Sequence, residues 1–144
     1  MIPFEAAFRQ WSVEDYLADE IRLCILNDSI ALTNLLAAPH FGGTGLTTDL
    51  SAAETIGGNF PANGFLLTSK TFLGSPPLAD LANLPQVAQD PANPTDIRYG
   101  VIVNFTRTDR VIYGFFDYGA QDASSGPVDL NFPNGLFTMD GNDT

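Results

Sequence analysis

The residues best able to do chemistry are the single histidine, His40, and the glycine-rich stretch that follows it, residues 42–45. A hydrolase triad would need a nucleophile and an orienting acid beside the histidine, and no serine of this sequence lies in a Gly-x-Ser-x-Gly turn. The glycine-rich stretch lacks the Lys-Ser or Lys-Thr of a phosphate loop and the spacing of a dinucleotide-binding loop. We therefore interpret His40 as a partly exposed loop residue and the glycines as a turn. No catalytic residue and no cofactor site is expected.

The 17 carboxylates raise two further kinds of site. A glycosidase needs two carboxylates that converge across a cleft, and Asp109, Asp117 and Asp122 lie near the ends of predicted strands. A small carbohydrate-active enzyme therefore stays open as a distant alternative. Calcium takes closely spaced Asp, Asn and carbonyl oxygens, and residues 140–143 hold a fragment of such a pattern without its glutamate. One Cys and one His are too few for a zinc site. We assign no metal-binding residue, and the binding of calcium stays open.

Length and charge narrow the class of protein. The chain has 144 residues, which is enough for one domain with a real core. It carries 6 Lys+Arg against 17 Asp+Glu, a formal charge of −11. Nucleic acids and anionic membranes require clustered basic side chains, so we expect neither as a partner. The first residues do not resemble a secretory signal, and Cys24 is the only cysteine, so we expect folding in a reducing cytoplasm.

The positions before residue 21 carry the one convincing helical pattern. Phe4, Phe8 and Trp11 are spaced by four and three residues, as on one face of a helix. Ser12 and Asp15 follow as a weak capping box. The sequence therefore predicts a helical arm over residues 1–20.

From residue 21 onward the pattern changes to the alternation that is typical of strands. Five segments are predicted as strands on this ground: 21–26, 65–73, 97–105, 111–116 and 128–132. A sixth, short strand is expected from residue 136. The polar turn over 106–109 joins two of the strands as a long β-hairpin. Residues 39–64 and 74–96 are interpreted mainly as loops, with a helical turn or two over 30–38.

These elements predict a mainly β fold with one domain over residues 1–144. Several short antiparallel strands with frequent turn signals favour a β-sandwich or jelly roll. We assign the sandwich to residues 21–138, after the helical arm of residues 1–20. The polar tail over residues 139–144 is expected to fray.

Aromatic side chains gather on the second strand of the predicted hairpin. Tyr113 and Phe115 are expected on one face, and Phe116 and Tyr118 on the other. A strand that is apolar on both sides is either central in a sandwich or covered by another subunit, and both interpretations stay open. The candidate protein-interface residues are Phe4, Phe8, Trp11, Tyr113, Phe115, Phe116 and Tyr118.

Several segments resemble small structural proteins from the virions of tailed bacteriophages. The strand 97–103 (IRYGVIV), the strand 111–119 (VIYGFFDYG) and the first strand 21–26 (IRLCIL) are similar to strands of that family. The loop and strand over 124–130 and the PNGL sequence at 133–136 match its later part. The residues before 21 and the proline-rich segment 74–96 depart from the family pattern. The resemblance implies a structural role, without enzymatic activity and without a cofactor.

The resemblance leads to an expected function as a capsid decoration (cement) subunit on the outer face of the head shell. An outer position agrees with the charge of −11, since packaged DNA would repel it. The expected partners are the major capsid protein or other virion subunits, together with further copies of the chain in a homo-oligomer such as a trimer. The expected location is the virion, assembled in the host cytoplasm. A tail- or fibre-associated protein that binds the host through residues 74–96 stays open as the alternative.

Overall fold

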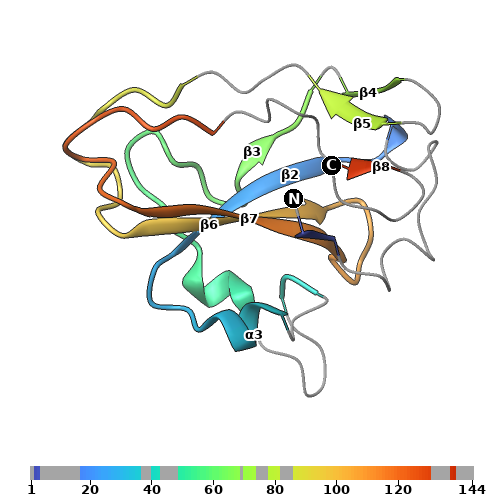
Figure 1. The fold of residues 1–144 in the computed structure, drawn as a ribbon, viewed down its shortest axis with the longest axis horizontal. Coiled ribbons are helices and arrows are strands. Elements are labelled where there is room, and N and C mark those ends of the chain that lie inside the picture. The colour runs from blue at the N-terminus through green and yellow to red at the C-terminus, as the bar shows by residue number, and fades with distance from the viewer. Residues whose placement is uncertain are drawn as a thin grey trace.

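The computed structural model describes residues 2–3, 17–36, 40–42, 49–68, 70–73, 78–81, 86–130 and 137–138 (Figure 1). Within these residues the protein is mainly β and antiparallel, with little helix, as predicted. A main sheet has the strand order β1-β7-β6-β2-β3, and a smaller sheet has the order β4-β5-β8. The elements are β1 (Ile2–Pro3), β2 (Ile21–Asn27), α3 (Leu32–Leu36), the 3-10 helix η1 (Leu50–Ala53), β3 (Phe65–Leu66), β4 (Lys70–Leu73), β5 (Leu78–Leu81), β6 (Ile97–Asn104), β7 (Ile112–Gln121) and β8 (Phe137–Thr138).

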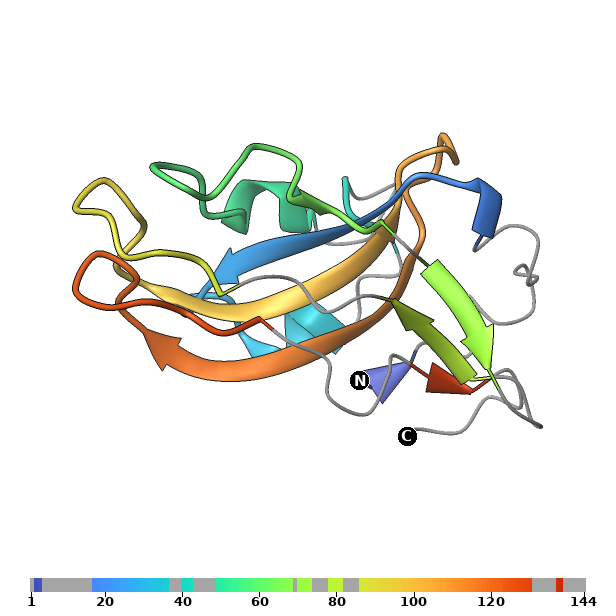
Figure 2. The ribbon, with the colours of Figure 1, turned by 90° about the horizontal axis from the view of Figure 1, so that it is seen from above.

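The predicted hairpin and the first predicted strand form the centre of the main sheet. β2 pairs with β6 from Ile21 opposite Asn104 to Asn27 opposite Ile97, and β6 pairs with β7 on its other side. Because these strands run antiparallel, the turn between β6 and β7 lies at one end of the main sheet and several longer loops lie at the other (Figure 2). We call these ends the hairpin end, which holds residues 17–22, 40–42, 70 and 104–111, and the loop end, which holds residues 27–29, 56–63, 88–98 and 117–126.

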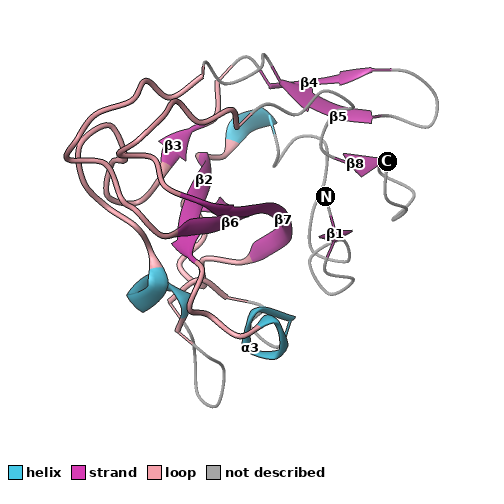
Figure 3. Cartoon of the chain, turned by 60° about the vertical axis from the view of Figure 1, so that its left-hand side comes forward, coloured by secondary structure: helices cyan, strands magenta, loops and turns pink. Residues whose placement is uncertain are grey.

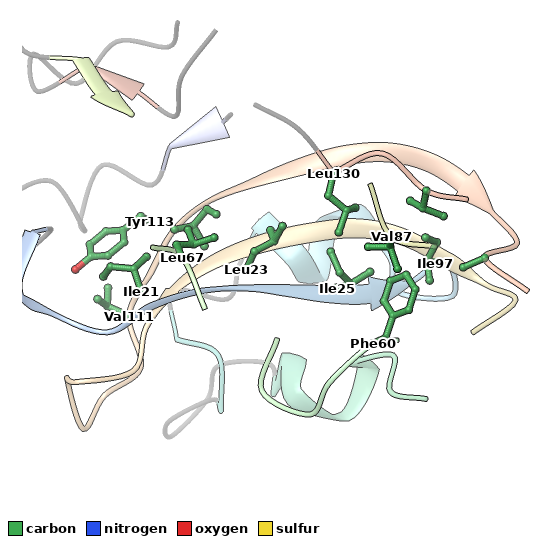
Figure 4. Close-up of a cluster of buried hydrophobic side chains, with 13 residues drawn as sticks. Ile21, Leu23, Ile25, Phe60, Leu67, Val87, Ile97, Val111, Tyr113 and Leu130 are labelled. Carbon is green, nitrogen blue, oxygen red and sulfur yellow. The ribbon is translucent and has the colours of Figure 1, made fainter. Parts of the chain in front are cut away.

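The main sheet is apolar on both faces, and the chain itself covers both. Loops cover one face, where β2 and β6 contribute Leu23, Ile25 and Ile102 (Figure 4). The residues that pack over this face are Phe60, Leu67, Val87, Val128 and Leu130. The other face presents Cys24, Leu26, Val101 and Phe115, over which α3, residue 41 and η1 place Leu35, Phe41 and Leu50. The helix and 3-10 helix on this side are cyan in Figure 3. The central strands are therefore buried on both sides.

Because of a β-bulge in β7, one aromatic side chain points to the face opposite to the predicted one. Alternation places Tyr113 on the same face as Phe115, but Tyr113 packs in the cluster that Phe116 and Tyr118 also contact, while Phe115 belongs to the opposite cluster. The pairing of β6 with β7 shifts between Ile102 and Val103. An extra residue in one strand reverses the alternation beyond it, so the prediction for Tyr113 was wrong.

Other predicted elements are confirmed in part. The helical turn within 30–38 is confirmed as α3, and the last short strand as β8. The predicted strand 65–73 is divided, with β3 in the main sheet and β4 in the smaller one. Val128 forms an isolated bridge with Val87 where a strand over 128–132 was expected. The prediction of a helical arm was wrong at residues 2–3, which pair with β7 as a strand. Residues 17–18 are helical and residues 19–20 are not. Residues 1 and 4–16 of the arm and the tail 139–144 lie outside the described residues.

The side-chain amide of one buried asparagine, Asn93, connects the loops at the loop end. Asn93 is 4% exposed, and its Oδ1 accepts a hydrogen bond from the backbone N of Asn59 at 2.7 Å. Its Nδ2 donates to the carbonyl oxygens of Ala88, at 3.0 Å, and Ala123, at 3.1 Å. Gly58 passes so close that a Cβ there would stand 2.4 Å from Asn93 Oδ1. Three loops that are distant in sequence are therefore joined through one side chain.

Candidate functional site at the hairpin end

The turn between β6 and β7 is held by a second buried amide, Asn104, which is fully buried. Its Oδ1 accepts from the backbone N atoms of Thr106, at 2.9 Å, and Arg107, at 3.1 Å, and so closes the turn. Its Nδ2 donates to Asp19 Oδ2 at 2.7 Å and to the Tyr113 hydroxyl at 2.9 Å. Because a buried amide needs all its partners, the turn has one preferred conformation. That conformation sets where the following side chains point.

Next to this turn, two guanidinium groups lie over the ring of Phe105. The Cζ atom of Arg110 is 4.1 Å from the ring centroid and that of Arg22 is 5.6 Å away. Phe41 packs beside the same ring, with centroids 6.1 Å apart. We call Arg22, Phe105 and Arg110 the arginine–aromatic cluster. Cation–π attraction of about 0.5–1 kcal/mol at such partly exposed sites holds the guanidinium planes in place.

The backbone at Arg110 is held in an unusual conformation. Its φ is +51°, in the left-handed region that side chains other than glycine rarely adopt. Hydrogen bonds on either side keep it there: Arg110 N donates to the Arg107 carbonyl at 3.2 Å, and Phe41 N donates to the Arg110 carbonyl at 2.9 Å. A cost of roughly 1–3 kcal/mol for such a residue persists only where the surroundings fix it. The direction of the Arg110 side chain is therefore fixed by the fold.

The arginines in and beside the cluster differ in whether they form ion pairs. Arg22 pairs with Glu20 at 2.5 Å, and Arg107 binds Asp109 through two hydrogen bonds of 3.0 and 2.8 Å. The Arg107 guanidinium lowers the pKa of Asp109. Arg110 makes no ion pair with any residue that the structure describes. A guanidinium can bind a planar carboxylate through two N–H groups, so the cluster offers a binding position for an external carboxylate.

His40 borders the cluster, since the neighbouring Phe41 packs beside Phe105. His40 bridges to Val111 and is partly exposed, as predicted. Its Nδ1 is buried, and within the described part of the chain it has no hydrogen-bond partner. Cys24 is buried, and burial raises the pKa of its thiol, as expected of a small apolar residue. Among the described residues, no group of three or more His, Cys, Asp or Glu side chains is placed to hold a metal ion.

The predicted interface residues are divided by their burial. Tyr113 is 1% exposed and Phe115 is 2% exposed, so the chain itself covers both rings. Phe116 and Tyr118 are partly exposed and stack on each other, with centroids 5.8 Å apart and planes at 21°. Phe4, Phe8 and Trp11 lie outside the described residues. Among the described aromatics of this set, only Phe116 and Tyr118 retain surface that a partner can touch.

The three carboxylates of the glycosidase alternative lie at two ends of the sheet and are held by local hydrogen bonds. Asp109 lies in the hairpin turn before β7, while Asp117 and Asp122 lie at the loop end, near the other end of that strand. Asp117 binds Arg98 through two hydrogen bonds of 3.2 Å, and Asp122 accepts from Ser124. These hydrogen bonds lower the pKa of each aspartate. Ionised carboxylates of this kind do not supply the raised pKa of a general acid.

Comparisons with models of known protein families, with curated proteins and with solved structures find no match for this chain. None of the helices in the described segments has the length and apolar character needed to cross a bilayer.

The arginine–aromatic cluster was not predicted from the sequence. Its three members are separated by 83 and 5 positions, so no local motif contains them. The signal that would have located it is the pairing of the strand 21–26 with the strand 97–105. That pairing brings Arg22 opposite Val103, two residues before Phe105.

Proposed function

We propose that the chain is a non-enzymatic structural subunit of a tailed-bacteriophage virion, and that it decorates the outer face of the head shell as a cement protein. One observation carries this proposal. The three segments of the virion-protein resemblance, 21–26, 97–103 and 111–119, are neighbouring strands at the centre of the main sheet. They would be the common framework of such a subunit, while the ends of the sheet would provide its contacts.

The finer architecture that we propose is a β-sandwich or jelly roll in which the β4-β5-β8 sheet forms the second layer. The chain passes from the main sheet to the smaller one within residues 67–70. Leu67 is buried there, and its N donates to the Ile21 carbonyl at 2.9 Å. This short connection supports a close packing of the two sheets. Protection from hydrogen exchange along both sheets, lost in one cooperative step, would agree with it, whereas independent opening of the smaller sheet would contradict it.

The charge supports a position on the outside of the head. A formal charge of −11 is repelled by packaged DNA and tolerated on the outer surface. The partners we propose are the major capsid protein or other virion subunits, and further copies of this chain. The arm with Phe4, Phe8 and Trp11 is the proposed contact with the shell, although these residues lie outside those described.

Quantitative mass spectrometry of purified virions tests this function. A decoration subunit is expected in on the order of hundreds of copies per particle, because a shell repeats its binding sites by symmetry. A copy number on the order of ten would overturn decoration in favour of the tail- or fibre-associated alternative. Absence from the particle would contradict both. Deletion of residues 1–12 is expected to abolish shell binding, and unchanged occupancy would refute the role of the arm.

A further inference from the structure

The charged side chains of the main sheet are separated between its two ends. The loop end carries five aspartates, Asp28, Asp90, Asp96, Asp117 and Asp122, and one cation, Arg98, which pairs with Asp117. At the opposite end of the same strands lie four cations, Arg22, Lys70, Arg107 and Arg110, together with Asp19, Glu20 and Asp109. A chain with a net charge of −11 therefore has one end at which positive and negative side chains are close to balanced, with Asp49 beside residues 40–42 as a fourth carboxylate, and one end that is strongly acidic.

Unpaired charges of opposite sign remain at the two ends. At the loop end, Asp28, Asp90, Asp96 and Asp122 make no ion pair with another described residue. Arg110 is likewise without a carboxylate partner among the described residues, and its guanidinium is held over Phe105. Both ends are pre-arranged, because Asn93 joins the loops and Asn104 fixes the turn. Pre-arranged groups lose little conformational entropy when they bind.

We propose that copies of this chain bind head to tail, with the arginine–aromatic cluster of one copy receiving aspartate carboxylates from the loop end of the next. The proposal rests on the proposed function, because it specifies the contact that holds the homo-oligomer together. The two surfaces differ, so the contact is heterologous and closes into a ring where the rotation between copies permits it. Each carboxylate replaces water on a guanidinium that the fold already positions.

The net charge does not prevent this contact at physiological salt. The Debye length is about 8 Å there, which is shorter than the sheet, so repulsion between the distant acidic groups of two copies is screened. Charges within direct contact are screened much less. Local complementarity at the two ends therefore outweighs the overall acidity.

The first test is the oligomeric state of the full chain by analytical ultracentrifugation from about 0.01 M to about 1 M ionic strength. The wild type is expected to associate at intermediate salt and to dissociate at high salt. Arg110→Glu is expected to weaken association at least about tenfold. Arg98→Glu is the matched control, because it changes the net charge equally but at the acidic end, and it is expected not to weaken association. Equal weakening by both variants would overturn the proposal, as would a wild type that is monomeric throughout.

The second test exchanges charges between the two ends. Asp122→Arg alone is expected to weaken association, with Asp96→Arg as a second variant in case the first disturbs its loop. A mixture of Arg110→Glu and Asp122→Arg chains is expected to associate where each alone does not, since each supplies the surface that the other lacks. A mixture that stays monomeric would refute the contact. Copy number per virion is measured independently, so failure of this contact is distinguishable from failure of the virion assignment.

Discussion

The ring of Tyr118 lies directly against Gly100 on the neighbouring strand. A Cβ atom built on Gly100 would stand 2.8 Å from Tyr118 Cε2 and 2.9 Å from Leu23 Cδ1. The backbone opposite Gly100 is that of Phe116, whose ring stacks on Tyr118. The close approach of this ring therefore requires a glycine at position 100. Because Gly100 has no side chain, the part of β7 that carries Tyr118 can pack against β6.

Replacing Gly100 by Ala is expected to destabilise the protein by about 1–3 kcal/mol, since the added methyl group must displace the Tyr118 ring or the Leu23 side chain. Chemical denaturation monitored by circular dichroism measures this. Gly126→Ala is the matched control, because a Cβ there meets nothing within 4 Å, and we expect a change within about 0.5 kcal/mol. Equal effects of the two substitutions would contradict the assigned packing.

Replacing Asn104 by Leu is expected to cost about 2–4 kcal/mol, because Asp19, Tyr113 and two backbone N–H groups of the turn lose their partner at a buried position. Equilibrium unfolding measures the loss. The control is Asn34→Ala on the exposed side of α3, for which little change is expected. A stability like that of the wild type would show that the turn does not depend on the amide.

The centre of the sheet was predictable because the sequence pattern that specifies it lies within neighbouring residues. Residues 97–105 and 111–116 alternate and flank a short polar turn, and this pattern alone predicts the hairpin that β6 and β7 form. The bulge at Tyr113 was not predictable, since nothing in the local sequence marks the extra residue. The division of residues 65–73 into β3 and β4 was not predictable for a related reason. Phe65, Leu67 and Leu73 keep the alternation of a single strand, although the chain changes sheets between them.

The candidate site depended on contacts between distant segments. The arginine–aromatic cluster forms only when β2 pairs with β6, and no spacing in the sequence predicts it. Its members are Arg22, Phe105 and Arg110. Asn93 was hidden likewise, as one of several polar residues in a proline-rich segment. Its role follows from burial and from hydrogen bonds to positions 30 or more residues away. Pairing of strands and loops, rather than local pattern, decides both.

Acid is expected to remove the contribution of the Arg107–Asp109 pair. The pKa of Asp109 lies below its ordinary value of 3.8 because Arg107 binds the ionised form in the folded state. The ionised carboxylate therefore stabilises the fold above the ordinary pKa, and this stabilisation is lost as pH falls through the lowered one. The difference in unfolding free energy between the wild type and Asp109→Asn should be constant at neutral pH and should shrink below about pH 4. Asp96→Asn, which removes an exposed aspartate without an ion pair among the described residues, serves as control, and a difference at Asp109 that grows with acid would contradict the pairing.

Two substitutions of Asn93 should separate the roles of its two polar atoms. Asn93→Ala removes the acceptor of the Asn59 amide and the donor to Ala88 and Ala123, so we expect a loss of about 2–4 kcal/mol. Asn93→Asp keeps an oxygen for the Asn59 amide but loses the donor. Hydrogen exchange at the Asn59 amide should therefore be fast in the alanine variant and remain slow in the aspartate variant, while both lose stability. Asn59→Ala, which removes only an exposed side-chain bond to Ala88, is the control and should cost less than about 1 kcal/mol. Equally fast exchange at position 59 in both Asn93 variants would show that the amide oxygen does not hold this loop.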